Sequence, residues 1–147
     1  MLRYRDDGNL HKDFHRTTNG TISYLRRTHG REVLDETFRR TARDVYRSIH
    51  DDLKAGDWDQ LIEHWTYFFD REEGDYTLEH TEDEIRLTVH SCPAIAYLLA
   101  RQIEVDPDFC RQTEVMNTTW AEGTPFAIST EVLGDGRCVQ TIRRNRP

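Results

Sequence analysis

The sequence lacks long apolar runs, an excess of basic residues and a set of paired cysteines, and each shortage excludes a class of protein. No window approaches the roughly 18 consecutive apolar residues of a membrane-spanning helix. The net charge is −7, with 27 acidic and 20 basic residues, which disfavours nucleic acid and anionic membranes as partners. The first residues have no apolar signal-peptide core. Three widely spaced cysteines do not form a disulfide framework, so we expect reduced thiols and a cytoplasmic location.

Several motifs that identify a catalytic class are also absent. The sequence contains no glycine-rich phosphate loop, no G-x-S-x-G elbow, no H-E-x-x-H motif and no C-x-x-C pair. What remains is a polar but globular chain, because its 36% hydrophobic residues are spaced periodically among 32% charged ones. A length of 147 residues predicts a single domain over residues 1–147.

Helical periodicity runs through most of the first half of the chain. Residues 1–8 are charged and aperiodic, which predicts a loose arm. Residues 9–29 fit one interrupted helix or two short ones, because poor helix formers occupy their middle. A clear amphipathic stripe over residues 34–53 and an aromatic one over residues 58–69 predict two further helices.

Period-2 alternation in the second half predicts four strands in two hairpins. The first hairpin covers residues 76–90, and the second covers residues 126–143 with a glycine-rich turn. Two helices lie between them, one from Pro93 to about residue 105 and one over residues 106–121. The grouping predicts an α+β fold in which N-terminal helices pack on an antiparallel sheet of about four strands.

The corner at Cys92 is the most distinctive local feature. Pro93 suits the first position of a helix, which places Cys92 at or next to the N-cap. The positive end of the helix dipole and the unpaired backbone N–H groups there favour a thiolate. His90 precedes Cys92 by two residues, so in an extended backbone the two side chains share a face. The alternative is a Cys92 that packs as a small hydrophobic residue.

Four more residues could belong to the same site. Cys110, Glu114 and Asn117 are spaced i, i+4, i+7 along the last predicted helix, and Cys138 lies on the last strand. Alternatively, the two cysteines pack in the core while Glu114 and Asn117 are solvated. His90 and the three cysteines could also form a tetrahedral zinc site, although they lack the close paired spacing of zinc motifs.

Four short motifs follow one another within residues 20–144. They are Tyr24-Leu25 with Gly30, the Cys92-Pro93 corner, Asp106-Pro-Asp-Phe-Cys110, and Gly136-Arg-Cys-Val-Gln-Thr-Ile142. Together they resemble the L-2-amino-thiazoline-4-carboxylate hydrolase family. The resemblance implies a small intracellular hydrolase that opens a cyclic amidine-like ring. The family's acidic residue soon after the helix cysteine has no close match here, which leaves the substrate open.

The sequence therefore predicts a cysteine-centred hydrolase of a small polar molecule. We expect Cys92 to attack the sp² carbon of a C–N bond while backbone amides after Pro93 stabilise the developing charge. His90 or Glu114 would relay protons, and Asn117 would hold a polar substrate group. Cys138 and Cys110 would line the pocket, with either one as the nucleophile if Cys92 is not.

The expected partner is a small-molecule substrate, with no nucleic acid, membrane, cofactor or bound metal. The oligomeric state is open, and a homo-oligomer is one option. The competing predictions are a non-catalytic small-molecule-binding module and a Cys/His metal-binding module. Convergence of the three sulfur atoms on one cavity would favour a functional site over separate packing roles.

Overall fold

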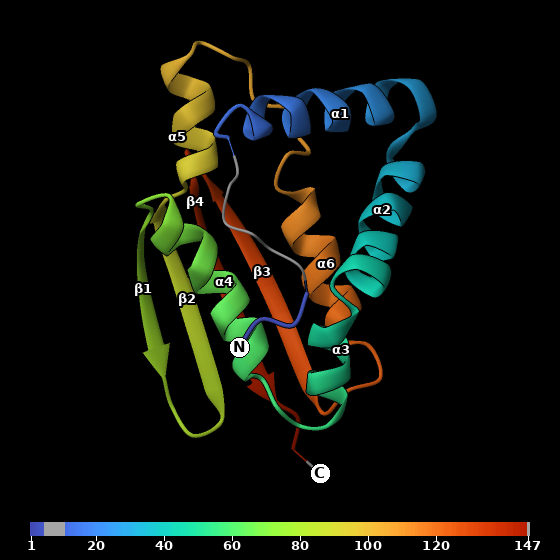
Figure 1. Cartoon of the computed structure of the whole chain (residues 1–147), viewed down its shortest axis with the longest axis vertical. Coiled ribbons are helices and arrows are strands. Elements are labelled where there is room, and N and C mark those ends of the chain that lie inside the picture. The colour runs from blue at the N-terminus through green and yellow to red at the C-terminus, as the bar shows by residue number, and fades with distance from the viewer. Residues whose placement is uncertain (5–10, 147) are drawn as a thin grey trace.

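The computed structural model describes residues 1–4 and 11–146. Figure 1 shows helices first and a sheet completed last along the chain. The elements are α1 (Phe14–His29), α2 (Arg31–Arg40), the π-helical turn η1 (Thr41–Val45), α3 (Arg47–Lys54), α4 (Asp59–Arg71), β1 (Asp75–His80), β2 (Glu84–Ser91), α5 (Pro93–Ala100), α6 (Arg111–Ala121), β3 (Phe126–Gly134) and β4 (Arg137–Arg144).

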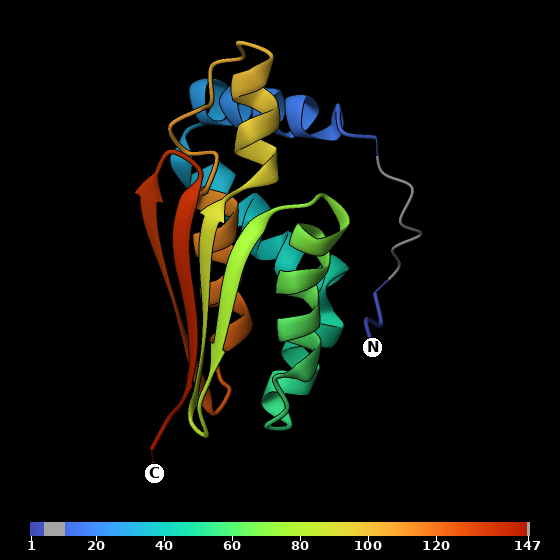
Figure 2. The same ribbon diagram turned by 90° about the vertical axis from the view of Figure 1, so that its left-hand side faces the viewer.

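The four strands form one antiparallel sheet in the order β1-β2-β4-β3. The two predicted hairpins are therefore confirmed, and they join through the pairing of β2 with β4. Helices α2, α3, α4 and α6 lie on one face of this sheet, and α1 and α5 lie beyond one end of it, as the side view in Figure 2 shows. The α+β prediction is confirmed. Among the described residues, no helix is long and apolar enough to cross a membrane.

The inner face of the sheet is apolar because side chains alternate along its strands. Ile85, Leu87 and Val89 of β2 are buried, whereas Arg86 between them is exposed. Helices α4 and α6 bring large aromatic side chains onto this face, including the buried Trp120. The core thus lies between the helices and one side of the sheet.

The predicted helix over residues 34–53 is divided in the structure. Helix α2 runs into η1, and Tyr46 then leaves helical geometry with φ −107° and ψ 28° before α3 begins. A π-helical turn adds a residue to the helical repeat and often occurs at functional sites. Here it changes the direction of the chain, and both Thr41 and Tyr46 line the cavity described below.

The first helix, α1, is continuous over the described residues. The sequence had left open whether one interrupted helix or two short ones would form here. Asn19, one of the weak helix formers in its middle, is buried and makes tertiary hydrogen bonds. The Asn19 side chain donates to the Glu104 carbonyl at 2.9 Å and accepts from the Asp106 backbone N–H at 2.9 Å. This residue therefore attaches α1 to the loop before α6.

The N-terminal arm is held rather than loose where the structure describes it. The guanidinium of Arg3 donates to both carboxylate oxygens of Asp52, at 2.6 and 2.7 Å. Its backbone N–H donates to Gln60 at 3.0 Å. Residues 5–8 of the predicted arm lie outside the described residues.

The two helices between the hairpins are shorter than predicted. Helix α5 ends at Ala100, and α6 begins at Arg111. Asp106-Pro107 starts a turn rather than a helix: Asp106 Oδ1 accepts from the Asp108 N–H at 2.9 Å, and Arg26 donates to both of its carboxylate oxygens at 3.0 and 2.7 Å. The loop before α6 is thus fixed by side-chain contacts.

Asp106→Asn is expected to lower the free energy of unfolding by about 1 to 2 kcal/mol at pH 7. The hydrogen bonds from Arg26 lower the pKa of Asp106 from 3.8 to about 2, so this stability is present above pH 4 and is lost as the pH falls toward 2. Urea unfolding at pH 7 and at lower pH measures it, with Glu104→Gln in the same loop as the control. An Asp106→Asn effect that does not shrink in acid would contradict this assignment.

Candidate functional site

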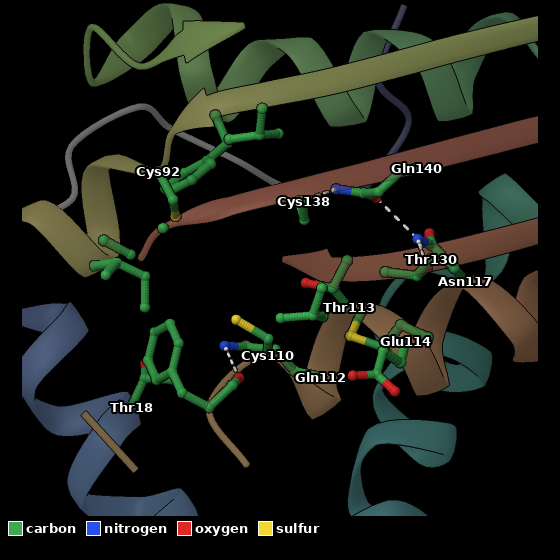
Figure 3. Close-up of a pocket in the computed structure, with 18 of the residues that line it drawn as sticks. Thr18, Cys92, Cys110, Gln112, Thr113, Glu114, Asn117, Thr130, Cys138 and Gln140 are labelled. Atoms are coloured by element: carbon green, nitrogen blue, oxygen red, sulfur yellow. Dashed lines mark hydrogen bonds between the residues drawn. The ribbon is translucent and has the colours of Figure 1, made fainter. Parts of the chain in front are cut away.

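A cavity of about 1040 Å³ lies against the inner face of the sheet, and all three cysteines line it. Figure 3 shows Cys92 at the α5 corner, Cys138 on β4 and Cys110 at the start of α6 around the same open space. The three sulfur atoms therefore converge on one cavity, which is the arrangement that favours a functional site over separate packing roles.

The cavity is larger than a small polar ring needs. Ligand pockets for drug-sized molecules range from about 300 to 1,000 Å³. Ten aromatic side chains contribute to the wall: Tyr4, Phe14, Phe38, Tyr46, Trp65, Tyr67, Phe68, Phe69, Phe109 and Trp120. Such a wall suits a flat apolar group, with polar side chains reaching the space from α6 and the strands.

Cys92 is at the helix N-cap, as predicted. It has φ −76° and ψ 122°, and Pro93 follows as the first residue of α5. Its backbone N–H donates to the Gly136 carbonyl at 2.8 Å, so the β3–β4 turn fixes the corner. Gly136 has φ +75°, and a Cβ there would lie 3.4 Å from Ile95. Only a residue without a side chain fits this approach comfortably.

The Cys92 thiol is buried, and burial determines its protonation. Desolvation raises its pKa, while backbone N–H groups of Ile95 and Ala94 lower it by a smaller amount. This direction runs against the expectation that the helix terminus makes Cys92 a thiolate. The amides point at the sulfur, but burial outweighs them.

The other two thiols are also protonated at neutral pH. Burial raises the pKa of Cys110 to about 12, with further increases from charge on Cys92 and Cys138. Burial raises the pKa of Cys138 to about 11. Cys110 occupies the N-cap of α6, not the helix interior as the predicted start at residue 106 implied. Any thiol chemistry in this cavity requires a base.

His90 does not reach the cavity, which corrects its predicted role. Its side chain is exposed and shares a 2.8 Å hydrogen bond with the Thr77 hydroxyl on β1. The preceding Val89 lines the cavity, so His90 points to the opposite face of the sheet. The chain leaves the strand before Cys92, and strand alternation therefore does not carry over from His90 to Cys92.

Asn117 is fully buried at 1% exposure and organises the polar wall. Its Oδ1 accepts from Trp65 Nε1–H at 3.1 Å, and its Nδ2 donates to Gln140 Oε1 at 2.8 Å and Thr130 Oγ1 at 3.0 Å. Gln140 Nε2 in turn lies 3.8 Å from the Cys138 sulfur. Both Asn117 donors are used within the protein, so this residue positions Gln140 rather than binding substrate as predicted.

Glu114 lines the cavity, but its carboxylate already has a cationic partner. Arg111 Nη1 lies 3.3 Å from Glu114 Oε2 and its other guanidinium nitrogens donate to Asp35 at 2.8 Å. The Glu114 side chain is 37% exposed. The predicted proton relay through Glu114 therefore has little support from the geometry.

Two buried polar residues in the cavity wall were not assigned roles from the sequence. Gln140 shares a strand face with Cys138, which alternation could have indicated. His15 is 4% exposed and its Nε2 lies 2.6 Å from Glu72 Oε1. Its burial with Asn19 and Ile22 follows an i, i+4, i+7 spacing, the only signal that could have identified it.

No group of three or more His, Cys, Asp or Glu side chains could hold a metal ion within residues 1–4 and 11–146. The three cysteines share a cavity without forming a coordination shell. Comparison with known proteins adds no identification: no protein-family model and no curated protein matches this chain.

Proposed function

We propose that the protein is a hydrolase that opens a C–N bond of a cyclic amidine-like ring through a covalent bond to Cys92. The observation that carries the proposal is the meeting of Cys92, Cys110 and Cys138 at one cavity, with Cys92 at the N-terminus of α5. Membership of the L-2-amino-thiazoline-4-carboxylate hydrolase family is part of the proposal. So is a cytoplasmic location, because three free thiols require a reducing compartment.

The geometry supports Cys92 as the nucleophile rather than the other two cysteines. Of the three cysteines, Cys92 alone has a pKa that is lowered by backbone N–H groups of the helix that follows it, those of Ala94 and Ile95. These donors would stabilise negative charge on sulfur as the proton leaves. Cys138 lies on β4, on the same side of the cavity as Cys92, and Cys110 lies across the cavity at the start of α6 (Figure 3).

The substrate is proposed to be larger than a simple thiazoline. The aromatic walls and the volume of about 1040 Å³ favour a heterocycle that carries an apolar substituent. Gln140, oriented by Asn117, offers an amide at the polar side of the cavity. A substituted cyclic amidine would place its ring near Cys92 and its apolar group among the aromatic side chains.

Trapping of the covalent intermediate tests the proposal. The protein is incubated with 2-aminothiazoline and with cyclic amidines carrying benzyl or alkyl groups, quenched in acid and mapped by mass spectrometry. We expect ring-opened product, faster for the substituted compounds, and a substrate-derived mass on the Cys92 peptide. Product without an adduct, or an adduct confined to Cys110 or Cys138, would overturn the proposed role of Cys92.

A non-catalytic small-molecule-binding role is the second candidate. The raised pKa values of all three thiols favour it, because protonated thiols are poor nucleophiles. In that case the same compounds would bind, as measured by calorimetry, without forming product. Iodoacetamide would then label Cys92 no faster than the other two cysteines.

A further inference from the structure

The proposed chemistry needs a base inside the cavity, and the sequence-derived candidates do not provide one. His90 lies on the opposite face of the sheet, and Glu114 is paired with Arg111. The buried Cys92 thiol holds its proton more firmly than a solvated thiol, because burial raises its pKa. A general base at hydrogen-bonding distance, or one water molecule away, would be required to activate it.

His15 and Glu72 form a buried pair with the required properties. Their side chains are 5% and 8% exposed, and His15 Nε2 lies 2.6 Å from Glu72 Oε1. A carboxylate accepts from Nε2–H, which leaves the lone pair on Nδ1. That nitrogen has no hydrogen-bond partner among residues 1–4 and 11–146. Since His15 lines the cavity, Nδ1 is the atom available to a group inside it.

This pair lies at the Cys92 end of the cavity. The His15 ring packs edge-on against Phe68 at 5.8 Å and against Tyr97 of α5 at 5.7 Å. Phe68 and Cys92 pack against the same two buried clusters. The charge of Glu72 also contributes to the pKa of Cys92, so the carboxylate is within electrostatic range of the thiol. In Figure 3, Thr18, three residues after His15 on α1, borders the cavity together with Cys92.

We propose that His15 is the general base that accepts the Cys92 proton, and that Glu72 is the positioning residue that fixes its tautomer and orientation. The inference rests on the proposed function. It gives the cavity a Cys-His-Glu arrangement in which each member comes from a different element: the α5 corner, α1 and the end of α4. Cys92 is the nucleophile, His15 is the base and the Glu72 carboxylate orients the base.

The proton and electron pairs balance without a further reactant except water. As sulfur bonds to the amidine carbon, the thiol proton moves to Nδ1 and the C=N electron pair moves to nitrogen. The imidazolium, stabilised by Glu72, returns that proton to the departing amine nitrogen as its C–N bond breaks. Water then adds to the carbon, giving one proton to His15, and the sulfur leaves and recovers it. The net reaction converts amidine and water into amide and amine.

Charged and polar side chains from α1, α5 and the end of α4 surround the His15 ring. Glu72 pairs with it directly, and Arg71 Nη2 lies 3.4 Å from the second carboxylate oxygen of Glu72. From α5, Tyr97 faces the ring, with Arg101 stacked 3.6 Å above the tyrosine. From the start of α1, Asp13 accepts from the Tyr97 hydroxyl. Arg16 of α1 also lies within electrostatic range of Tyr97.

Site-resolved alkylation tests the inference without a known substrate. Wild-type protein, His15→Gln and the surface control His90→Gln are treated with iodoacetamide from pH 5 to 9, and each cysteine peptide is quantified. We expect Cys92 to react fastest in the wild type. In His15→Gln its rate at pH 7 should fall at least about 10-fold, and its pH–rate profile should move to higher pH because the thiol then has no base. His90→Gln should match the wild type.

The outcomes separate the inference from the proposed function. An unchanged Cys92 rate and pH profile in His15→Gln would overturn the role of His15 while leaving Cys92 as the reactive thiol. A wild-type Cys92 that reacts no faster than Cys110 and Cys138 would instead count against the proposed function. If His15→Gln accelerates all three cysteines, the fold has opened, and the near-isosteric Glu72→Gln decides: a slower Cys92 supports the pair, and an unchanged Cys92 overturns it.

Discussion

Cys92→Ala is expected to reduce kcat/KM for ring opening at least about 1000-fold, which corresponds to about 4 kcal/mol of transition-state stabilisation. The substitution removes the thiol whose pKa is lowered by the backbone N–H groups of Ala94 and Ile95 in the following helix. Alanine suits this partly buried corner sterically, and the Cys92 N–H to Gly136 bond involves only backbone atoms. The rate is measured from ring-opened product by liquid chromatography and mass spectrometry, with thermal unfolding as a check on folding.

The two remaining cysteines supply matched controls. Cys138→Ala removes a partly buried thiol that Gln140 Nε2 approaches at a long 3.8 Å, so we expect less than about a 10-fold change in kcat/KM. Cys110→Ala tests the alternative nucleophile. Full activity in Cys92→Ala combined with loss in Cys110→Ala would transfer the nucleophilic role to the start of α6.

Asn117→Leu is expected to lower the free energy of unfolding by about 3 to 5 kcal/mol. Leucine has a similar volume but cannot replace the three hydrogen bonds to Trp65, Gln140 and Thr130. The indole N–H of Trp65, which is 5% exposed, would lose its acceptor in the core. A buried donor without a partner costs more than the net value of the bond it made. Urea unfolding followed by fluorescence measures the change.

The neighbouring Thr118 provides the control for Asn117. Thr118 is exposed on the same helix, and its hydroxyl donates only to the Glu114 carbonyl. Thr118→Ala should therefore change the unfolding free energy by less than about 0.5 kcal/mol. An Asn117→Leu variant that unfolds within 1 kcal/mol of the wild type would show that the α6–sheet contact does not depend on this amide.

The parts of the fold that could be predicted were the helices and strands with a regular local spacing of apolar residues. The alternation of Ile85, Leu87 and Val89 identifies β2 because one sheet face is buried and the other is solvated. The predicted helix start at residue 106 was wrong, because only a turn follows Asp106 and α6 begins at Arg111. Asp106 accepts from the Asp108 N–H as a cap would, but its carboxylate also binds Arg26, eighty residues earlier. No local pattern contains that contact.

In the candidate site, too, the features that depend on local sequence could be predicted and those that depend on distant contacts could not. The Cys92 corner could be identified from Pro93 alone, and the cavity did bring the three cysteines together. The prediction that His90 shares a face with Cys92 was wrong because strand alternation stops where the strand ends. His15 was not predicted from the sequence because its partner Glu72 is 57 residues away. Its burial is also only partly indicated by the periodicity of its helix. The protonation of Cys92 required knowing how the surrounding cavity excludes water.

The position of β4 in the sheet has a consequence for how the chain folds. This strand is the last in sequence, yet it lies between β2 and β3. During synthesis β2 therefore presents an unpaired edge until residues 137–144 have left the ribosome, and such an edge can pair with other chains. The same strand carries Cys138 and Gln140, so the wall of the cavity is completed in the final pairing step. Contacts of such long sequence separation make slow folding expected.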